Sequence, residues 1–141
     1  MKVLIIDDSL VDRMIIRRLL LSLDHEVIMA EDGIEAFRLF EQEDPDLVLL
    51  DLRMPNLDGF QVVAELRNKQ LGWRPILFLS NSMDTESFVK GIFAGADDFL
   101  HKPIEKSRLE AKLHAMDRLV AMRKQLLNLT DPQNPKTPCG V

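Results

Sequence analysis

Five short apolar runs, separated by segments of helical periodicity, restrict the fold of this sequence more than any other feature. The runs lie at residues 3–6, 27–30, 47–50, 76–79 and 99–100. They are continuous rather than alternating, which is typical of strands covered on both faces. Strands of this kind, joined by crossover helices, require a parallel sheet with right-handed connections. The sequence therefore predicts a doubly wound α/β fold, in which helices cover both faces of a five-stranded parallel sheet.

The segments between the runs predict five helices. We place them at residues 10–23, 34–41, 60–69, 85–93 and 107–129. The first opens with Ser9 three residues before Asp12, a spacing at which the serine hydroxyl can accept a hydrogen bond from a free amide at the helix start. One stripe of this helix is apolar and is formed by Val11, Met14, Ile15 and Leu19.

Length and composition exclude several classes of protein. The 141 residues are 46% hydrophobic and 29% charged, which fits one soluble domain with a core of its own. Cys139 is the single cysteine, so neither an intramolecular disulfide nor a structural zinc site is expected. No apolar stretch approaches the roughly 20 residues that cross a bilayer, and no signal peptide is apparent. We expect a cytoplasmic protein without a membrane partner.

Charge is unevenly distributed along the chain. Residues 1–105 hold 11 Lys and Arg against 20 Asp and Glu, whereas residues 106–141 hold 7 against 3. The acidic part argues against binding to a phosphate backbone, and the basic part is short and poor in aromatic residues. With no helix-turn-helix in the sequence, we expect no direct contact with nucleic acid.

Polar residues follow the apolar runs where the runs end. Asp7 and Asp8 follow the first run, Asp51 the third and Ser80 the fourth, and Lys102 comes shortly after the fifth. In an open parallel sheet, ligands bind at the carboxyl ends of the strands. Taken singly, such acids are typical of helix starts, such a serine of a cap, and such a lysine of a solvated surface. Their joint placement predicts a functional site.

The residue types at this site indicate phosphoryl chemistry. Three clustered carboxylates repel one another, and Mg²⁺ is a hard cation that accepts a few carboxylates and keeps several waters. Asp51 ends a strand that should be central, where an unpaired acid is costly. With no activated Ser, Cys or His nearby, this carboxylate is the candidate nucleophile, and Asp can form an acyl phosphate. Ser80 and Lys102 would then bind the phosphoryl oxygens.

Three stretches of the chain resemble the receiver domain of two-component response regulators. They are residues 3–9 (VLIIDDS), 45–59 (PDLVLLDLRMPNLDG) and 95–103 (GADDFLHKP). The resemblance covers about residues 2–122 and implies a flavodoxin-like fold with the strand order 2-1-3-4-5, which the receiver fold itself exemplifies.

The resemblance also implies a phosphorylation site and a metal site. Asp51 would accept a phosphoryl group from a sensor histidine kinase or a phosphotransfer protein. Asp8, Asp51 and the backbone carbonyl of Arg53 would bind Mg²⁺ directly, and Asp7 would bind it through water. The protein would be a phospho-acceptor that assists its own phosphorylation and dephosphorylation, and not an enzyme acting on an external substrate.

A switch is implied by the same resemblance. The hydroxyl of Ser80 would turn toward the phosphoryl group, Lys102 would contact that group, and Phe99 would be the aromatic residue that turns inward. The bond between Lys102 and Pro103 is cis in the family. Asn81 departs from the small residue that the family usually has, which leaves the lifetime of the acyl phosphate open.

The last predicted helix is unusually long. Apolar residues follow a 4-3 spacing along it, with Arg123 as the one charged residue at a seam position; they are Leu109, Leu113, Met116, Val120, Leu127 and Thr130. We expect this helix to pack on the sheet up to about Met116 and to pair beyond it. A homodimer is predicted through this helix, or through the face formed by the fourth helix, the fifth strand and the fifth helix. Residues 1–122 would form the receiver domain, and residues 123–141 a helical extension with a disordered, Pro-rich tail or linker.

Three other hypotheses compete with this interpretation. The chain could be the N-terminal piece of a multidomain regulator whose output domain, for example a cyclic-dinucleotide enzyme or a phosphatase, is absent. It could be an Mg²⁺-dependent phosphatase, but Arg53 stands where haloacid-dehalogenase-like phosphatases carry a second acid. It could be a degenerate receiver that binds partners without phosphorylation, which the complete set of site residues disfavours.

Overall fold

The computed structural model describes residues 1–55, 57–69, 73–81 and 84–130. Strands and helices alternate along the chain: β1 (Lys2–Ile6), α1 (Leu10–Ser22), β2 (Glu26–Ala30), α2 (Gly33–Glu43), β3 (Leu47–Asp51), α3 (Gly59–Asn68), β4 (Ile76–Ser80), α4 (Thr85–Ala94), β5 (Asp98–His101) and α5 (Lys106–Thr130). All five strands and five helices predicted from the sequence are confirmed, with bounds within two residues. The predicted Pro-rich tail at residues 131–141 lies outside the described residues.

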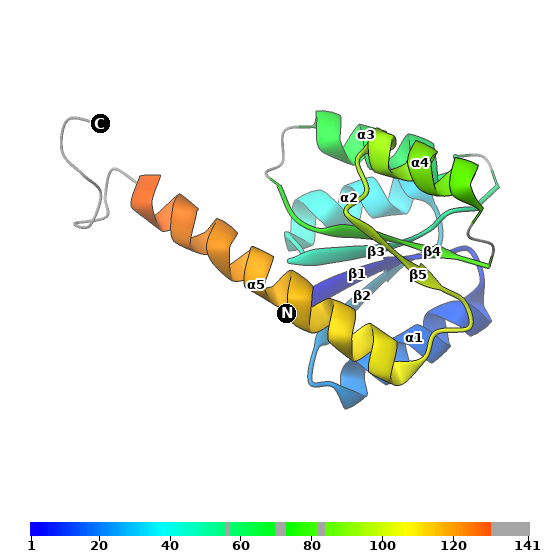
Figure 1. Ribbon diagram of the computed structural model, residues 1–141, viewed down its shortest axis with the longest axis horizontal. Coiled ribbons are helices and arrows are strands. Elements are labelled where there is room, and N and C mark those ends of the chain that lie inside the picture. Colours follow the sequence, from blue (N-terminus) through cyan, green and yellow to red (C-terminus); the bar gives the residue numbers. More distant parts are fainter. Residues whose placement is uncertain (56, 70–72, 82–83, 131–141) are drawn as a thin grey trace.

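The five strands form one parallel sheet in the order β2-β1-β3-β4-β5. Helices α2, α3 and α4 cover one face of the sheet, and α1 and α5 cover the other (Figure 1). The doubly wound fold and the strand order are thus as expected.

The strands are buried on both faces, which explains their continuous apolar sequence. In β1, Leu4 and Ile6 face the cluster beneath α2 and α3, and Val3 and Ile5 face the cluster beneath α1 and α5. Because β1 and β3 are interior strands, residues at their carboxyl ends come to lie at the middle of one sheet edge.

The apolar stripe of α1 that the sequence suggests is not the buried face of the helix. Ile16 and Leu20 are the buried residues of α1, whereas Val11, Met14 and Ile15 are exposed and Leu19 is half-buried. The helix is apolar around much of its circumference, so its periodicity could not single out the face that meets the sheet. The predicted cap is confirmed, because the Asp12 amide donates to the hydroxyl of Ser9 at 3.2 Å.

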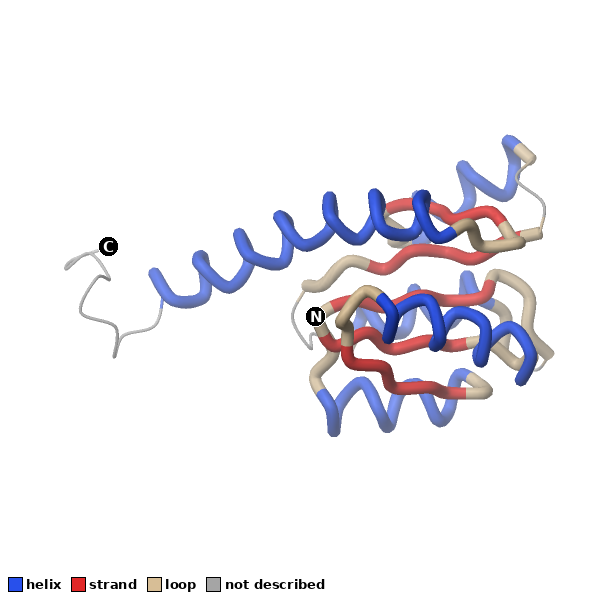
Figure 2. The backbone as a smooth tube through the Cα atoms, turned by 90° about the horizontal axis from the view of Figure 1, so that it is seen from below, coloured by secondary structure: helices blue, strands red, loops and turns tan. Residues whose placement is uncertain are grey.

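Helix α5 packs on the molecule one turn further than expected. Leu109, Leu113, Met116 and also Val120 are buried, and Leu127 is exposed. The helix continues past the amino-terminal ends of the strands, where Lys124 Nζ lies 3.2 Å from Asp46 Oδ1, and its last turns extend away from the body of the protein (Figure 2). The side chain of Thr130 lies outside the described part. Among the described residues, no helix has the length and apolarity that crossing a membrane requires.

Candidate functional site

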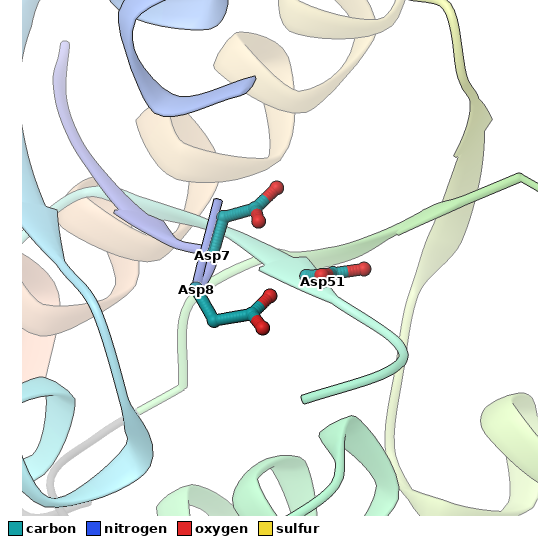
Figure 3. A group of neighbouring side chains, drawn as sticks. All are labelled: Asp7, Asp8 and Asp51. Carbon is teal, nitrogen blue, oxygen red and sulfur yellow. The ribbon is translucent and has the colours of Figure 1, made fainter. Parts of the chain in front are cut away.

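The fold brings together the three carboxylates predicted to share a site. Asp7 and Asp8 directly follow β1, and Asp51 is the last residue of β3. Their carboxyl groups face one space (Figure 3), and one oxygen of each lies within 4.8 Å of the others. Asp7 and Asp51 are buried, whereas Asp8 is exposed. The cluster is therefore open to solvent on the Asp8 side.

Local hydrogen bonds position Asp7. Its amide donates to the carbonyl of Ala30 at 3.1 Å, which extends the β1–β2 pairing by one residue. Its Oδ1 accepts from the Ser9 amide at 2.9 Å, and its carbonyl accepts from the Arg13 guanidinium at 2.7 Å. Residues at the start of α1 therefore hold both the carboxylate and the backbone carbonyl of Asp7 in place.

A glycine fixes the approach of α3 to the end of β3. A Cβ at Gly59 would lie 2.7 Å from the carbonyl oxygen of Asp51 and 2.9 Å from the Cα of Leu52. Contacts that short leave no room for a side chain, and both neighbours are backbone atoms that cannot rotate away. Glycine at this position lets the N-terminus of α3 pack directly against the backbone at the end of β3.

Lys102 brings the positive charge to the cluster. Its Nζ lies 2.8 Å from Asp7 Oδ2, 2.9 Å from Asp12 Oδ2 and 3.6 Å from Asp51 Oδ1. The side chain is only 8% exposed, and its amide donates to the carbonyl of Ser80 at 2.8 Å. Sequence reasoning found Lys102 but assigned Asp12 only to the start of a helix. One signal could have revealed Asp12, namely an acid four residues after Asp8 on a helix that begins at the site.

The burial and charges at the site shift two pKa values. Burial, and next the charge of Asp7, raise the pKa of Asp51 to about 7, although Lys102 opposes the shift. Burial lowers the pKa of Lys102, but hydrogen bonds to Asp7 and Asp12 outweigh it and raise the pKa above its ordinary value. An ammonium ion therefore faces carboxylates whose combined negative charge it does not neutralise.

The remaining predicted site residues lie around this cluster. Ser80 is buried at the end of β4, and Asn81 follows it on the surface. Arg53 is exposed, and its amide donates to Asp51 Oδ1 at 3.4 Å. The peptide bond between Lys102 and Pro103 is cis, as the resemblance implies.

Phe99 lies farther from the carboxylates, among other aromatic rings. It is 3% exposed, and its ring centroid is 5.5 Å from that of Phe78 and 5.1 Å from that of Phe88. A Cβ at Gly91 would lie 2.6 Å from Phe99 Cζ, so α4 needs glycine there to accommodate the inward ring. The aromatic residue thus occupies the inner position in this structure.

The donor set fits Mg²⁺. The three residues supply carboxylate oxygens, which this hard cation prefers, and the exposure of Asp8 leaves space for waters or phosphoryl oxygens to complete the coordination. No sulfur or imidazole donor belongs to the cluster, so softer metals are not favoured.

Comparison with known proteins assigns the class. Residues 3–114 match the family model of the response regulator receiver domain, which is most of the chain. The protein belongs to the response regulator receiver family. Receiver domains are signalling domains that generally bind Mg²⁺ at an acidic pocket, and response regulators are phosphorylated by histidine kinases.

Individual relatives agree with this assignment. The probable transcriptional regulator ycf27 of Porphyridium aerugineum is 40% identical over 119 residues, which are 84% of this chain and 49% of that protein. The response regulator MprA of Mycobacterium sp. (strain KMS) is 36% identical over 138 residues, covering 97% of this chain and 55% of that protein. The chain thus spans about half the length of these relatives.

Solved structures support the same fold. The chemotaxis protein CheY4 of Vibrio cholerae superposes with a TM-score of 0.77 at 32% sequence identity, over 82% of this chain and 97% of that one. The match covers nearly the whole of that protein, so its fold and that of this chain share the complete five-stranded unit.

Proposed function

We propose that this protein receives a phosphoryl group on Asp51 from a histidine kinase or a phosphotransfer protein in the cytoplasm. The observation that carries the proposal is the position of Asp51 at the end of an interior strand, with Asp7 and Asp8 on one side and the ammonium of Lys102 at 3.6 Å. This arrangement pairs a nucleophilic carboxylate with a group that can bind phosphoryl oxygens.

The chemistry would proceed by transfer between two protein side chains. A carboxylate oxygen of Asp51 attacks phosphorus, the P–N bond of the donor phosphohistidine breaks, and the electron pair returns to the imidazole. Lys102 keeps its proton throughout and donates a hydrogen bond to a phosphoryl oxygen. Asp7, Asp8, Asp51 and the Arg53 carbonyl would hold Mg²⁺, which would supply positive charge to the phosphoryl oxygens.

The phosphoryl group would then operate a switch. It carries about −1.5 to −2 charges in place of the one negative charge of the ionised carboxylate, and it brings three acceptor oxygens beside Ser80. We infer that the Ser80 hydroxyl turns to donate a hydrogen bond to one of these oxygens. The ring of Phe99, which lies between β4 and α4, would change its position in response. The surface of α4, β5 and α5 would carry the change to a partner.

Residues 1–122 would form the receiver domain, and the residues from 123 onward would form an extension of it. The long helix α5, which runs from the first part into the second, would serve as a self-association surface. The seam suggested by the sequence is buried up to Val120, and beyond it Leu127 is exposed. A second apolar stripe is exposed and has the 3-4-3 spacing of a coiled coil; it comprises Leu119, Met122, Leu126 and Leu129. We propose a second copy of this chain as its occupant.

This dimer can be tested by sedimentation. Replacing Leu119 and Leu126 together by serine should shift the protein from dimer to monomer, because both lie on the exposed stripe. Replacing the neighbouring exposed Gln125 by serine is the matched control and should leave the dimer unchanged. A wild-type monomer, or a variant that stays dimeric, would contradict the proposal.

The names of the longer relatives suggest what the receiver acts on after phosphorylation. The ycf27 relative is named a probable transcriptional regulator and the MprA relative a response regulator, and this chain covers about half the length of each. We propose that the acidic receiver contributes phosphoryl-dependent docking rather than base contacts, and that any contact with DNA comes from other parts of such regulators. The names of these relatives do not favour a cyclic-dinucleotide or phosphatase output.

Intact-protein mass spectrometry tests the acceptor. After incubation with acetyl phosphate and Mg²⁺, the wild type should gain one phosphoryl group, and Asp51→Asn or omission of Mg²⁺ should abolish the gain. The control is Asp46→Asn, which removes an acid at the other end of the same strand and should still be labelled. Persistent labelling of Asp51→Asn would refute the assignment, and release of phosphate without an adduct would indicate a short-lived acyl phosphate.

A further inference from the structure

Asp12 contacts the site although the proposed chemistry gives it no role. It lies in the first turn of α1, 90 positions from Lys102, and its Oδ2 is 2.9 Å from Lys102 Nζ. Its side chain is 37% exposed, whereas the lysine is 8% exposed. The contact therefore joins a buried ammonium to an acid at the rim of the site.

The position of Lys102 is asymmetric among its carboxylate neighbours. Two of its N–H donors reach Asp7 and Asp12 at hydrogen-bond distance, and Asp51 Oδ1 stays at 3.6 Å. The ammonium is thus drawn toward α1 and away from the acceptor. Its two nearest carboxylate partners are Asp7, directly after β1, and Asp12 in α1.

Packing alone does not hold the lysine there. A cavity of about 220 Å³ adjoins it, lined by Asp12, Asn81, Ile104 and neighbouring residues. The cavity borders the lysine on the side of α1, so the side chain is not enclosed there, and removing its partner on α1 should change where the ammonium rests.

A purely structural role is the competing explanation for Asp12, since acids in the first turn stabilise a helix. Glu35 in α2 is the matched example. It also lies in the first turn of its helix, behind an N-cap aspartate, and its carboxylate accepts from the Glu31 amide at 3.2 Å. Glu35 and Asp12 share the helix position, but the ion pair to Lys102 belongs to Asp12.

We propose that Asp12 is a positioning residue that holds the ammonium of Lys102 off Asp51. The Asp51 carboxylate then stays available to a divalent cation, and the pull of Lys102 on a phosphoryl group is weakened. The second consequence rests on the proposed phospho-acceptor function, whereas the first depends only on the acidic cluster.

The proposal predicts effects of opposite sign in Asp12→Asn. Without the Asp12 charge, Lys102 should move toward Asp51 and compete with the cation, so affinity for Mg²⁺ should fall. The same shift frees the ammonium for an anionic phosphoryl mimic and removes a repelling charge, so affinity for the mimic should rise. A weakened α1 would instead lower both affinities.

Two NMR titrations measure these affinities through backbone amide shifts around Asp51. The first uses Mg²⁺ alone, and the second uses beryllofluoride at saturating Mg²⁺. In Asp12→Asn we expect the affinity for Mg²⁺ to fall about three- to ten-fold and the affinity for beryllofluoride to rise by a similar factor, as one charge a few ångströms away would cause. Asp12→Glu should restore much of the wild-type behaviour, and Glu35→Gln should match the wild type.

The possible outcomes separate this inference from the proposed function. An unchanged Mg²⁺ affinity in Asp12→Asn, or a fall in both affinities, would overturn the positioning role. If wild type binds Mg²⁺ but neither beryllofluoride nor a phosphoryl group, the acceptor function fails, and the Mg²⁺ titration still decides the role of Asp12.

Discussion

Strand β3 has an aspartate at each end, and the two behave in opposite ways. Burial raises the pKa of Asp46, but hydrogen bonds from the Lys2 amide and from Lys124 outweigh it and lower that pKa below its ordinary value. At the other end, burial and the charge of Asp7 raise the pKa of Asp51 to about 7. The residue type is the same, so the difference comes from the neighbours that the fold supplies.

Charge balance distinguishes the two ends. At the amino end, Asp46 accepts from the Lys2 amide at 2.8 Å and from Lys124 at 3.2 Å, and the nearby Asp44 pairs with Arg74 at 2.7 Å. At the carboxyl end, Asp7, Asp12 and Asp51 all lie within 4 Å of one ammonium, that of Lys102. A balanced set of charges stabilises the fold, whereas an excess of carboxylates suits the binding of a cation.

Removing Lys102 should have the largest effect on stability. Lys102→Ala leaves Asp7, which is fully buried, without its cation, so the free energy of unfolding should fall by about 2–4 kcal/mol in the absence of Mg²⁺. Urea denaturation measures the loss. Adding Mg²⁺ should restore part of it, because a cation bound to the native state stabilises that state. A loss below 1 kcal/mol would mean that Asp7 does not depend on the lysine.

Neutralising the two strand-end acids should change stability in opposite directions. Asp51→Asn removes a charge that the fold holds at a cost, so without Mg²⁺ it should stabilise the protein by about 1–3 kcal/mol near pH 8. Asp46→Asn removes a charge that is well paired, so it should destabilise by about 0.5–1.5 kcal/mol. Thermal and urea unfolding of both variants provide the comparison. Shifts of the same sign would show that the charge balance at the two ends does not differ as described.

The pH dependence should separate the same two ends. Asp51 has a raised pKa, so the folded state holds a proton that the unfolded state has lost between about pH 4 and 7, and stability falls as pH rises through this window. The advantage of Asp51→Asn over wild type should therefore grow from pH 5 to pH 8. Asp46 has a lowered pKa, so its contribution is present above its ordinary pKa and is lost only in more acidic solution. The difference between Asp46→Asn and wild type should stay constant from pH 5 to pH 8.

Mg²⁺ should suppress the first of these two dependences. A cation bound at the acidic cluster favours the ionised carboxylate, so the wild type should gain stability with Mg²⁺ mainly above pH 7. Denaturation curves with and without Mg²⁺ at pH 5 and pH 8 test this. An equal gain at both pH values would place the cation somewhere other than beside Asp51.

The carboxyl-end cluster could be predicted because it depends on strand order alone. Asp7 and Asp8 directly follow β1 and Asp51 ends β3, and these two strands are neighbours in the order 2-1-3-4-5 that the resemblance implies. Lys102 follows β5 at the same edge of the sheet. Asp12 could not be found so directly, since its role depends on the angle at which α1 crosses the sheet. The sequence showed a first-turn acid and gave no distance to Lys102.

Helix faces were harder to predict than strand ends. Neighbouring positions on a helix point about 100° apart, and α1 carries apolar residues at both Ile15 and Ile16. Packing against β1 and β2 buries Ile16 and leaves Ile15 exposed, which no periodicity could decide. In α5 the reach of the packing to Val120 depends on contacts at the amino end of the sheet, and these come from distant parts of the chain.

The smallest expected effect is at the balanced end. Lys124 is 60% exposed, and its partner Asp46 keeps the bond from the Lys2 amide, so Lys124→Ala should lower the free energy of unfolding by less than about 1 kcal/mol. Its local effect should be clearer, because Lys124 ties the last turns of α5 to the body of the protein. Hydrogen exchange should become faster in α5 beyond Val120 and stay unchanged before it. Exchange that is unchanged throughout would show that the buried Val120 alone anchors the helix, and a global loss as large as that of Lys102→Ala would remove the contrast between the two ends of the sheet.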